Sequence, residues 1–180
     1  MRIIGISGKI GSGKSTAADF LEDKFNATGS RAKQVSFAYA LKKVVATLCD
    51  TSFETQLSQS GKNTIDPVLG KSYGSLQQLV GTGLRETVDP NIWIKIALDT
   101  PRSDTEILII PDVRFKNEAQ SIIDRGGFLI RMEGDPANIR KNSNRDLNHI
   151  SETDLDDWQQ WNLIIYNKSL NVLYSSLEKI

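Results

Sequence analysis

Apolar residues in this chain gather into five short runs, which are separated by longer polar or amphipathic stretches. The runs occupy residues 2–7, 33–38, 106–113, 127–133 and 162–167. Three of them carry continuous isoleucine and leucine, which is typical of strands that are covered on both faces. The pattern therefore predicts five buried strands.

Between these runs, apolar residues recur at the three- and four-residue spacing of amphipathic helices. The apolar positions of three such stretches are Ala17, Ala18, Leu21 and Phe25; Ala119, Ile122 and Ile123; and Leu170, Leu173 and Leu177. Strands that alternate with helices predict an α/β protein with a parallel sheet. A length of 180 residues fits a single domain, here residues 1–180, and we find no internal repeat or linker.

Two stretches interrupt the alternation. Residues 50–75 are polar and rich in turn residues, and residues 134–152 are polar and partly basic without an apolar face. Both are open to a simple interpretation as surface insertions. Loops at the carboxyl ends of parallel strands are, however, where such sheets bind ligands, so a functional role is equally open.

Composition narrows the range of partners. Lys plus Arg and Asp plus Glu both number 22, so the formal net charge is zero and gives no general support for binding nucleic acid or a membrane surface. The single cysteine, Cys49, cannot form an intrachain disulfide, which favours a reducing compartment. The amino terminus has no signal-peptide pattern and no apolar run is long enough for a membrane span. We expect a cytoplasmic protein without nucleic-acid or membrane partners.

The segment GISGKIGSGKST, residues 5–16, matches the P-loop pattern and lies between the first predicted strand and the first predicted helix. Glycines let several backbone N–H groups point at phosphate oxygens, and the helix presents its positive end to the same anion. Lys14 is expected to reach the β- and γ-phosphates of ATP, and Ser15 to coordinate Mg²⁺. The predicted nucleotide-binding residues are Gly8, Lys9, Gly11, Ser12, Gly13, Lys14, Ser15 and Thr16.

The loop alone leaves the destination of the γ-phosphate open. GTPase switches carry an Asn-Lys-x-Asp segment that reads the base, whereas here Asn167 and Lys168 are followed by Leu170 at the position of the Asp. Large P-loop motors need longer cores. The chain therefore fits a small-molecule kinase better than a switch or a motor.

Residues 109–119, IIPDVRFKNEA, carry the next candidates. Asp112 ends a predicted strand, where its carboxylate could hold Mg²⁺ directly or through water. Arg114 offers a rigid fork of donors suited to phosphate. A structural salt bridge at the end of the strand is the alternative for this pair.

Four segments, together with the P-loop, resemble the phage-type deoxynucleoside monophosphate kinases in the same order. They are FAYALKKVVATL (37–48), LQQLVGTGLRETVDPNIWI (76–94), IIPDVRFKNEAQSI (109–122) and HISE (149–152). The resemblance implies a P-loop NTPase fold with a five-stranded parallel sheet flanked by helices, an NMP-binding insertion at about 39–100 and a lid at about 134–152. It also implies transfer of the γ-phosphate of ATP to a deoxynucleoside monophosphate, which yields the diphosphate and ADP, and the host cytoplasm if the source is viral.

By position, the resemblance makes Arg85 and Arg114 ligands of the acceptor phosphate, with Lys42 as a further candidate. Phe37 and Tyr39 are candidates for stacking on the base. The chain departs from the family pattern at Ser75, Gly83 and Ile150, which leaves the base preference open.

Transfer to a monophosphate needs cations rather than a base, because the second pKa of a phosphate monoester lies near 6. The lid candidate contributes four cations, Arg131, Arg140, Lys141 and Arg145. We expect Arg140 and Arg145 to act there, although each could equally be solvated surface. The predicted catalytic set is Lys14, Asp112, Arg114, Arg140 and Arg145.

Other readings stay open. A structural hydrogen bond is favoured for His149, and packing is favoured for Trp93, Trp158 and Trp161. For Glu152, a helix start after Ser151 and a functional role are equally open. The acceptor could be a non-nucleotide such as dephospho-coenzyme A or phosphomevalonate, or the chain could be a nucleotide-dependent switch. The sequence leaves a homodimer open.

Overall fold

The computed structural model describes residues 1–139 and 149–180, and it divides the chain into two compact units. The first unit consists of Met1–Ser36 with Pro101–Ile180, and the second consists of Phe37–Thr100. Arg140, Lys141 and Arg145, which the sequence assigns to a lid, lie outside the described residues.

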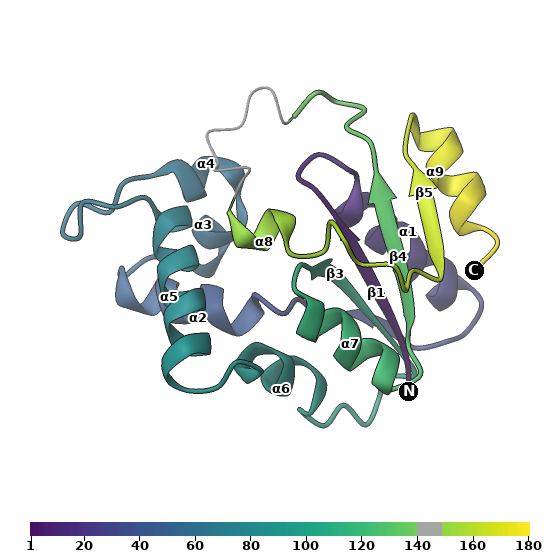
Figure 1. Ribbon diagram of the computed structural model, residues 1–180, viewed down its shortest axis with the longest axis horizontal. Helices are drawn as coiled ribbons and strands as arrows, with labels where there is room; N and C mark the ends of the chain where they lie inside the picture. The colour runs from purple at the N-terminus through teal and green to yellow at the C-terminus, as the bar shows by residue number, and fades with distance from the viewer. Residues whose placement is uncertain (140–148) are drawn as a thin grey trace. The chain divides into compact units, whose positions relative to one another are not determined.

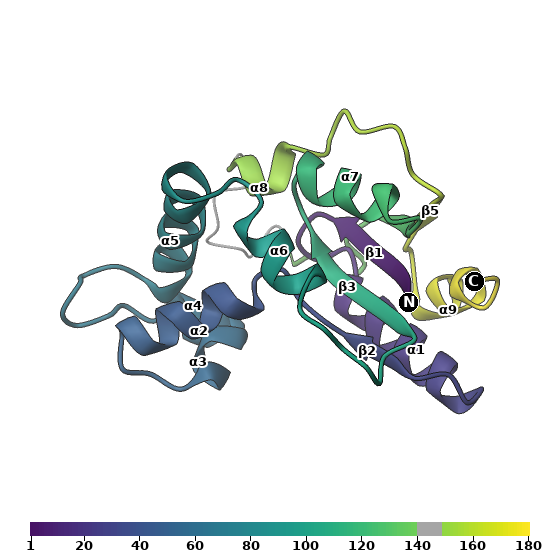
Figure 2. The same cartoon turned by 90° about the horizontal axis from the view of Figure 1, so that it is seen from below.

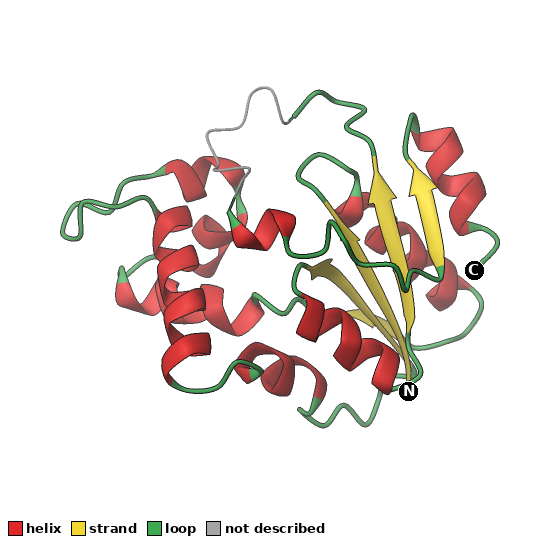
Figure 3. Cartoon of the chain, viewed as in Figure 1, coloured by secondary structure: helices red, strands yellow, loops and turns green. Residues whose placement is uncertain are grey.

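The first unit is built on a parallel sheet (Figure 1). Its strands are β1 (Arg2–Gly8), β2 (Ala32–Gln34), β3 (Ile107–Val113), β4 (Phe128–Glu133) and β5 (Leu163–Tyr166). They lie in the order β2-β3-β1-β4-β5, and every neighbouring pair is parallel. The prediction of a five-stranded parallel sheet is confirmed. Figure 3 shows the strands of this unit gathered into one sheet.

The second strand is shorter than the apolar run 33–38 predicts. β2 ends at Gln34, and only the N–H of Val35 continues the pairing, at 2.9 Å from the carbonyl oxygen of Ile109. Ser36 then turns its hydroxyl to Asp112, so the chain leaves the sheet before the run ends. At Ser36 the side-chain bond to Asp112 takes the place of the backbone hydrogen bonds that pair β2 with β3.

Helices cover both faces of the sheet, which is why the strands read as continuous apolar runs. The covering helices are α1 (Lys14–Ala27), α7 (Lys116–Asp124) and α9 (Leu170–Leu177). The short helix α8 (Ile150–Thr153) lies between β4 and β5 in the chain. The main core lies under α1 and α9, where Leu21, Leu173 and Leu177 are fully buried against Ile4 and Met132. Figure 2 shows α1 and α7 on opposite sides of the strands.

The α7 face depends on one glycine in β1. A Cβ on Gly5 would lie 2.6 Å from Cδ1 of Ile122 and 2.8 Å from Cδ2 of Leu129. Because real Cβ atoms do not come this close to other carbons, glycine lets α7 approach the central strand. This close packing anchors α7 beside the strand that leads into the P-loop.

The second unit is helical, with α2 (Tyr39–Leu48), α3 (Phe53–Leu57), α4 (Gln59–Asn63), α5 (Tyr73–Thr87) and α6 (Ile92–Leu98). Its small core contains Val45, Tyr73 and Leu76. Trp93 is also buried in this unit and donates from Nε1 to the carbonyl of Gly81 at 3.1 Å, as the packing interpretation of this tryptophan predicts.

Two short helices occupy the turn-rich stretch 50–75. The hydroxyls of Ser52 and Ser58 accept hydrogen bonds from the N–H groups of Thr55 and Gly61, which starts α3 and α4. None of the helices within residues 1–139 and 149–180 combines the length and apolar character that crossing a bilayer requires.

Candidate active site

The P-loop of residues 8–15 fills the turn between β1 and α1, as its placement in the sequence predicts. Gly11 and Gly13 adopt φ angles of 80° and 91°, which disfavour any residue with a Cβ. A Cβ at Gly11 would overlap the carboxylate of Asp135, and one at Gly13 would overlap the side-chain amide of Asn167. Backbone angle and space both require glycine at these two positions.

Lys14 folds back over this loop. Its ammonium donates to the carbonyl oxygens of Gly8 at 2.7 Å and Lys9 at 2.9 Å. The cation therefore lies on the concave side of its own loop, where a bound phosphate would meet it. This geometry is compatible with the predicted role of Lys14.

The first turn of α1 provides a second anion-binding element. Gly13, the N-cap residue, offers no side chain to cap the helix, and the first turn contains no acidic residue. The first intrahelical bond joins the N–H of Ala17 to the carbonyl of Gly13 at 2.9 Å. The positive end of a 14-residue helix thus faces the loop without a protein carboxylate in that turn.

Asn167 supports the loop from the end of β5. Its Nδ2 donates to the carbonyl of Ser12 at 3.0 Å, and the residue is 4% exposed. Among the described residues, neither Oδ1 of Asn167 nor Oγ of Ser12 has a hydrogen-bond partner although both are buried. The sequence analysis named Asn167 only in the comparison with the GTPase segment and did not predict this role; its position at the end of the fifth apolar run is the available signal.

Asp112 lies beside the start of the loop because of the sheet register. Val113 pairs with Ser7, the residue before the first P-loop glycine. The hydroxyl of Ser36 donates to Oδ2 of Asp112 at 2.5 Å and fixes the orientation of the carboxylate. Sequence reasoning missed Ser36, whose contact spans 76 positions of the chain.

Arg114 follows on the same strand end and is held on two sides. Its N–H donates to Oε2 of Glu118 at 2.8 Å, and Glu118, which is 1% exposed, also accepts from the N–H of Phe115 at 3.1 Å. Nη1 of Arg114 donates to the carbonyl of Ser151 at 3.2 Å and forms an ion pair with Glu152. Arg114 therefore forms a salt bridge with Glu152 of the HISE segment, whereas the alternative left open from the sequence concerned Asp112 and Arg114.

His149 caps the short helix α8. Its Nδ1 accepts from the N–H of Ser151 at 3.2 Å and lies 2.9 Å from the hydroxyl of the same residue. This is a structural hydrogen bond of the kind expected from the sequence. Glu152 belongs to α8, in line with the helix start that the sequence left open for it.

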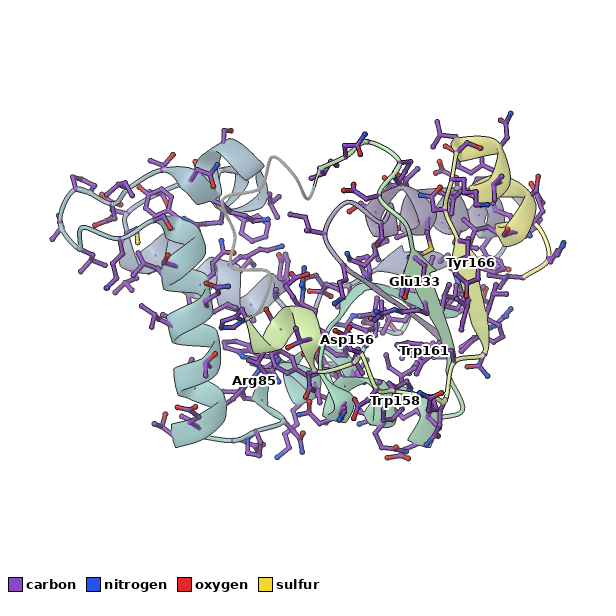
Figure 4. All side chains as sticks on the ribbon, turned by 45° about the horizontal axis from the view of Figure 1, so that its top comes forward. Arg85, Glu133, Asp156, Trp158, Trp161 and Tyr166 are labelled. Carbon is purple, nitrogen blue, oxygen red and sulfur yellow. The ribbon has the colours of Figure 1, made fainter. Side chains whose placement is uncertain are left out.

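Lys9 and Arg131 meet at a carboxylate that the sequence did not indicate. Lys9 forms an ion pair with Asp156 at 2.7 Å, and Arg131 reaches the other oxygen of Asp156 at 3.4 Å and Glu133 at 2.7 Å. The guanidinium of Arg131 lies 5.5 Å from the ring centre of Trp161. Figure 4 labels Glu133, Asp156 and Trp161 in this cluster. Arg131, expected in a mobile lid, lies instead in β4 and is 8% exposed.

The remaining predicted acceptor residues belong to the second unit. Phe37 is buried, Lys42 lies on α2, and Arg85 lies on α5, where Nη1 donates weakly to the carbonyl of Pro90 at 3.4 Å. Tyr39, the other base-stacking candidate, is 46% exposed and carries the ammonium of Lys43 at 4.6 Å from its ring centre. They are thus in a different unit from Lys14, Asp112 and Arg114.

A parallel sheet with a glycine-rich loop between β1 and α1, and an acidic residue on the neighbouring strand, defines the P-loop NTPase class. No family model matches the chain. A protein of Acanthamoeba polyphaga mimivirus, which carries the provisional name deoxynucleotide monophosphate kinase, is 30% identical over 196 aligned positions. The alignment covers 98% of this chain and 94% of the viral protein. The chain belongs to the deoxynucleotide monophosphate kinase family, so it is a kinase, and the resemblance noted in its sequence is confirmed.

Solved structures with similar folds include two that cover nearly all of this chain. The crystal structure of APE1195 has a TM-score of 0.48 with 16% identity, over 99% of this chain and 96% of that one. Shikimate kinase from Aquifex aeolicus has a TM-score of 0.43 with 12% identity, over 98% of this chain and 92% of that one.

Proposed function

We propose that this kinase transfers the γ-phosphate of ATP to the phosphate of a deoxynucleoside monophosphate, which yields the diphosphate and ADP. The name of the viral relative supports this acceptor class. The observation that carries the proposal is the pairing of Val113 with Ser7, which sets Asp112 and Arg114 beside the P-loop. In the proposed function, Asp112 would bind the metal and Arg114 the acceptor phosphate, on either side of the donor site.

The loop fits the triphosphate of ATP. Glycine angles that expose backbone N–H groups, an uncapped helix end and the inward-folded ammonium of Lys14 are all suited to phosphate oxygens. In the proposed reaction Lys14 binds the β- and γ-phosphates and neutralises charge as the γ-phosphate leaves. Residues Gly8 to Thr16 position the donor through their backbone.

The residues present also fit Mg²⁺. Ser15 and Asp112 offer the hard oxygen donors that this ion prefers, and the bond from Ser36 holds the Asp112 carboxylate in one orientation. In the described part of the chain, no group of three or more His, Cys, Asp or Glu side chains could hold a metal by itself. This suits an ion that is bound by one or two protein oxygens together with substrate phosphates and water. When bound, Mg²⁺ would supply positive charge that neutralises the phosphates during transfer.

The acceptor needs cations rather than a general base. A phosphate monoester is already largely dianionic at pH 7, so its oxygen can attack without losing a proton to the protein. In the proposed function, Arg114, Arg85 and Lys42 bind the acceptor phosphate, and Phe37 or Tyr39 contacts the base. Arg140 and Arg145 are proposed to neutralise the transferred group.

The test is a coupled ADP-release assay with ATP, Mg²⁺ and each deoxy- and ribonucleoside monophosphate in turn. Lys14→Ala removes the proposed phosphate-binding ammonium, and Lys33→Ala removes an exposed lysine of β2 as a matched control. Acceptor-dependent ADP release that is lost only in Lys14→Ala is the expected result. Turnover with dephospho-coenzyme A or phosphomevalonate alone would overturn the acceptor class, and turnover without any acceptor would indicate a switch.

A further inference from the structure

Arg114 presents two different edges of its guanidinium. Nη1 is engaged by α8, through the carbonyl of Ser151 at 3.2 Å and the carboxylate of Glu152. Among the described residues, Nε and Nη2 have no protein partner, because the other bond of this residue leaves from its backbone N–H to Glu118. One edge of the fork is thus fixed while the opposite edge remains able to donate.

The unused edge has the geometry that phosphate requires. Nε and Nη2 of arginine carry two parallel N–H groups that bind two oxygens of one phosphate. The arginine side chain keeps 25% of its surface exposed, so an anion can reach it. The backbone of Arg114 is fixed in addition by Glu118, so little freedom remains in the direction of the fork.

Glu152 is not an ordinary surface partner. Its side chain is only 5% exposed, and Oε2 is buried without a hydrogen-bond partner among the described residues. By contrast, Asp157, on the segment that follows α8, pairs with Lys116 while 73% of its side chain is exposed. A buried carboxylate costs free energy unless a cation compensates it, so Glu152 and Arg114 are strongly coupled.

The turn that carries Glu152 is fixed by its own cap. His149 accepts from the N–H of Ser151, which orients the Ser151 carbonyl and the next residue toward Arg114. The HISE segment therefore provides both acceptors for Nη1. Ser151 and Glu152 thus act together on one nitrogen of Arg114.

We infer that Glu152, with the carbonyl of Ser151, is a positioning residue that holds Nη1 of Arg114 so that Nε and Nη2 face the phosphate of the acceptor. The identity of that phosphate as the acceptor's rests on the proposed function. Glu152 itself does not contact the substrate. It acts through the direction of the Arg114 fork.

Kinetics of a double-mutant cycle test this role. Glu152→Ala is expected to lower kcat/KM for the best monophosphate by about 10- to 100-fold, which is the range for loss of a hydrogen bond to a charged group. The KM for ATP should change by less than about twofold. Arg114→Ala should lower kcat/KM at least as much, and Glu152→Ala should cost nothing further in the Arg114→Ala background. Additive losses would show a direct contact of Glu152 with substrate, and equal losses toward ATP would show a general structural defect; either overturns the inference.

Two further variants serve the double-mutant cycle, one as a milder substitution of Glu152 and one as a control on the same segment. Glu152→Gln retains an oxygen that can accept from Nη1, so an intermediate loss is expected, and this variant carries the test if Glu152→Ala does not fold. Asp157→Asn removes the exposed partner of Lys116 on the same segment and should leave kcat/KM for the monophosphate unchanged. A loss in Asp157→Asn equal to that in Glu152→Gln would contradict the assignment.

A binding measurement separates this inference from the proposed reaction. Inorganic phosphate is titrated into the full chain while the Nε–H signal of Arg114 is followed by NMR, with assignment from its loss in Arg114→Lys. The expected result is a phosphate-dependent shift that needs about tenfold more phosphate in Glu152→Ala. An Arg114 signal that phosphate does not move overturns the inference even if the kinase is active. A shift of the expected kind without transfer to any monophosphate supports the positioning role and overturns the proposed reaction alone.

Discussion

The side-chain amide of Asn167 donates a 3.0 Å hydrogen bond to the carbonyl of Ser12, which ties the end of β5 to the P-loop. The two residues are 155 positions apart, and both are buried. The loop that is expected to hold the donor phosphates is therefore shaped by the last strand as well as by its own glycines. Three of the following predictions depend on such long-range support.

Asn167→Ala should loosen the loop. The substitution leaves the buried carbonyl of Ser12 without its donor, which is expected to lower the free energy of unfolding by about 1–3 kcal/mol and to raise the KM for ATP. Urea denaturation and steady-state kinetics measure the two effects. Asn171→Ala, on the exposed surface of α9, is the control and should change neither. An Asn167→Ala protein with unchanged ATP affinity would mean that this bond does not shape the nucleotide site.

Gly13→Ala should be more harmful than its backbone angle alone explains. Gly13 has φ of 91°, and an added Cβ would overlap the Asn167 amide. Gly29 has φ of 88° with no atom within 4 Å of an added Cβ, so Gly29→Ala reports the cost of the angle alone, about 1–2 kcal/mol. Chemical denaturation of both variants, with binding of an ATP analogue, should show a larger loss of stability for Gly13→Ala and loss of binding in that variant only. Equal losses of stability in Gly13→Ala and Gly29→Ala would show that the overlap with Asn167 does not contribute.

Ser36→Ala should weaken the response to Mg²⁺. The hydroxyl of Ser36 lies 2.5 Å from Oδ2 of Asp112, and its loss removes one restraint on the orientation of the carboxylate. We expect the Mg²⁺ concentration for half-maximal activity to rise several-fold, by about the 0.5–1.5 kcal/mol of one hydrogen bond. A Mg²⁺ titration at saturating ATP measures this, with Ser103→Ala, on an exposed loop of the same unit, as the control. An identical Mg²⁺ dependence would show that Ser36 does not act through the metal site.

The Lys116–Asp157 pair should contribute stability in a defined pH range. The hydrogen bond from Lys116 lowers the pKa of Asp157, and the same bond raises the pKa of Lys116. A lowered carboxyl pKa gives stability that is present above the ordinary value of 3.8 and is lost as the pH falls through the folded-state value. A raised ammonium pKa gives stability that is fully present below the ordinary value of 10.5 and is lost as the pH rises through the folded-state value.

Melting temperatures of the wild type and Asp157→Asn should therefore differ slightly at neutral pH and converge at low and at high pH. Because both groups are exposed, the difference should also shrink in high salt. Convergence is the informative observation. A difference that persists below the ordinary carboxyl pKa would show that the variant acts through something other than the ion pair.

Strands could be predicted from the sequence where they depend on residues close together in the chain. Continuous Ile and Leu runs predicted the strands because both faces of this sheet are covered, and the run 33–38 failed only where Ser36 turns away to bond Asp112. Helices α3 and α4 were not indicated because each is five residues long and depends on a serine cap rather than on an apolar face.

The side chains that pair with the site residues were harder to predict from the sequence. Arg131 was expected among the cations of a lid, yet it lies in β4 between Glu133 and Asp156, neither of which the sequence marked. Charge alone does not reveal whether an arginine is solvated or paired, and one of the two paired acids, Asp156, is 25 positions away. The same holds for Arg114, whose motif was evident while Glu152 as its partner was not.

The sequence by itself determined the P-loop, the parallel α/β class and the positions of Lys14, Ser15, Asp112 and Arg114 at the ends of their elements. Those features follow from backbone conformation and apolar periodicity, which act over a few residues. Only the tertiary structure decided that Asn167 supports the loop, that Ser36 orients Asp112 and that Glu152 holds one edge of Arg114. Such contacts join residues between 38 and 155 positions apart. The first two form because the parallel register brings strand ends together at one edge of the sheet, and the third because α8 meets the end of β3.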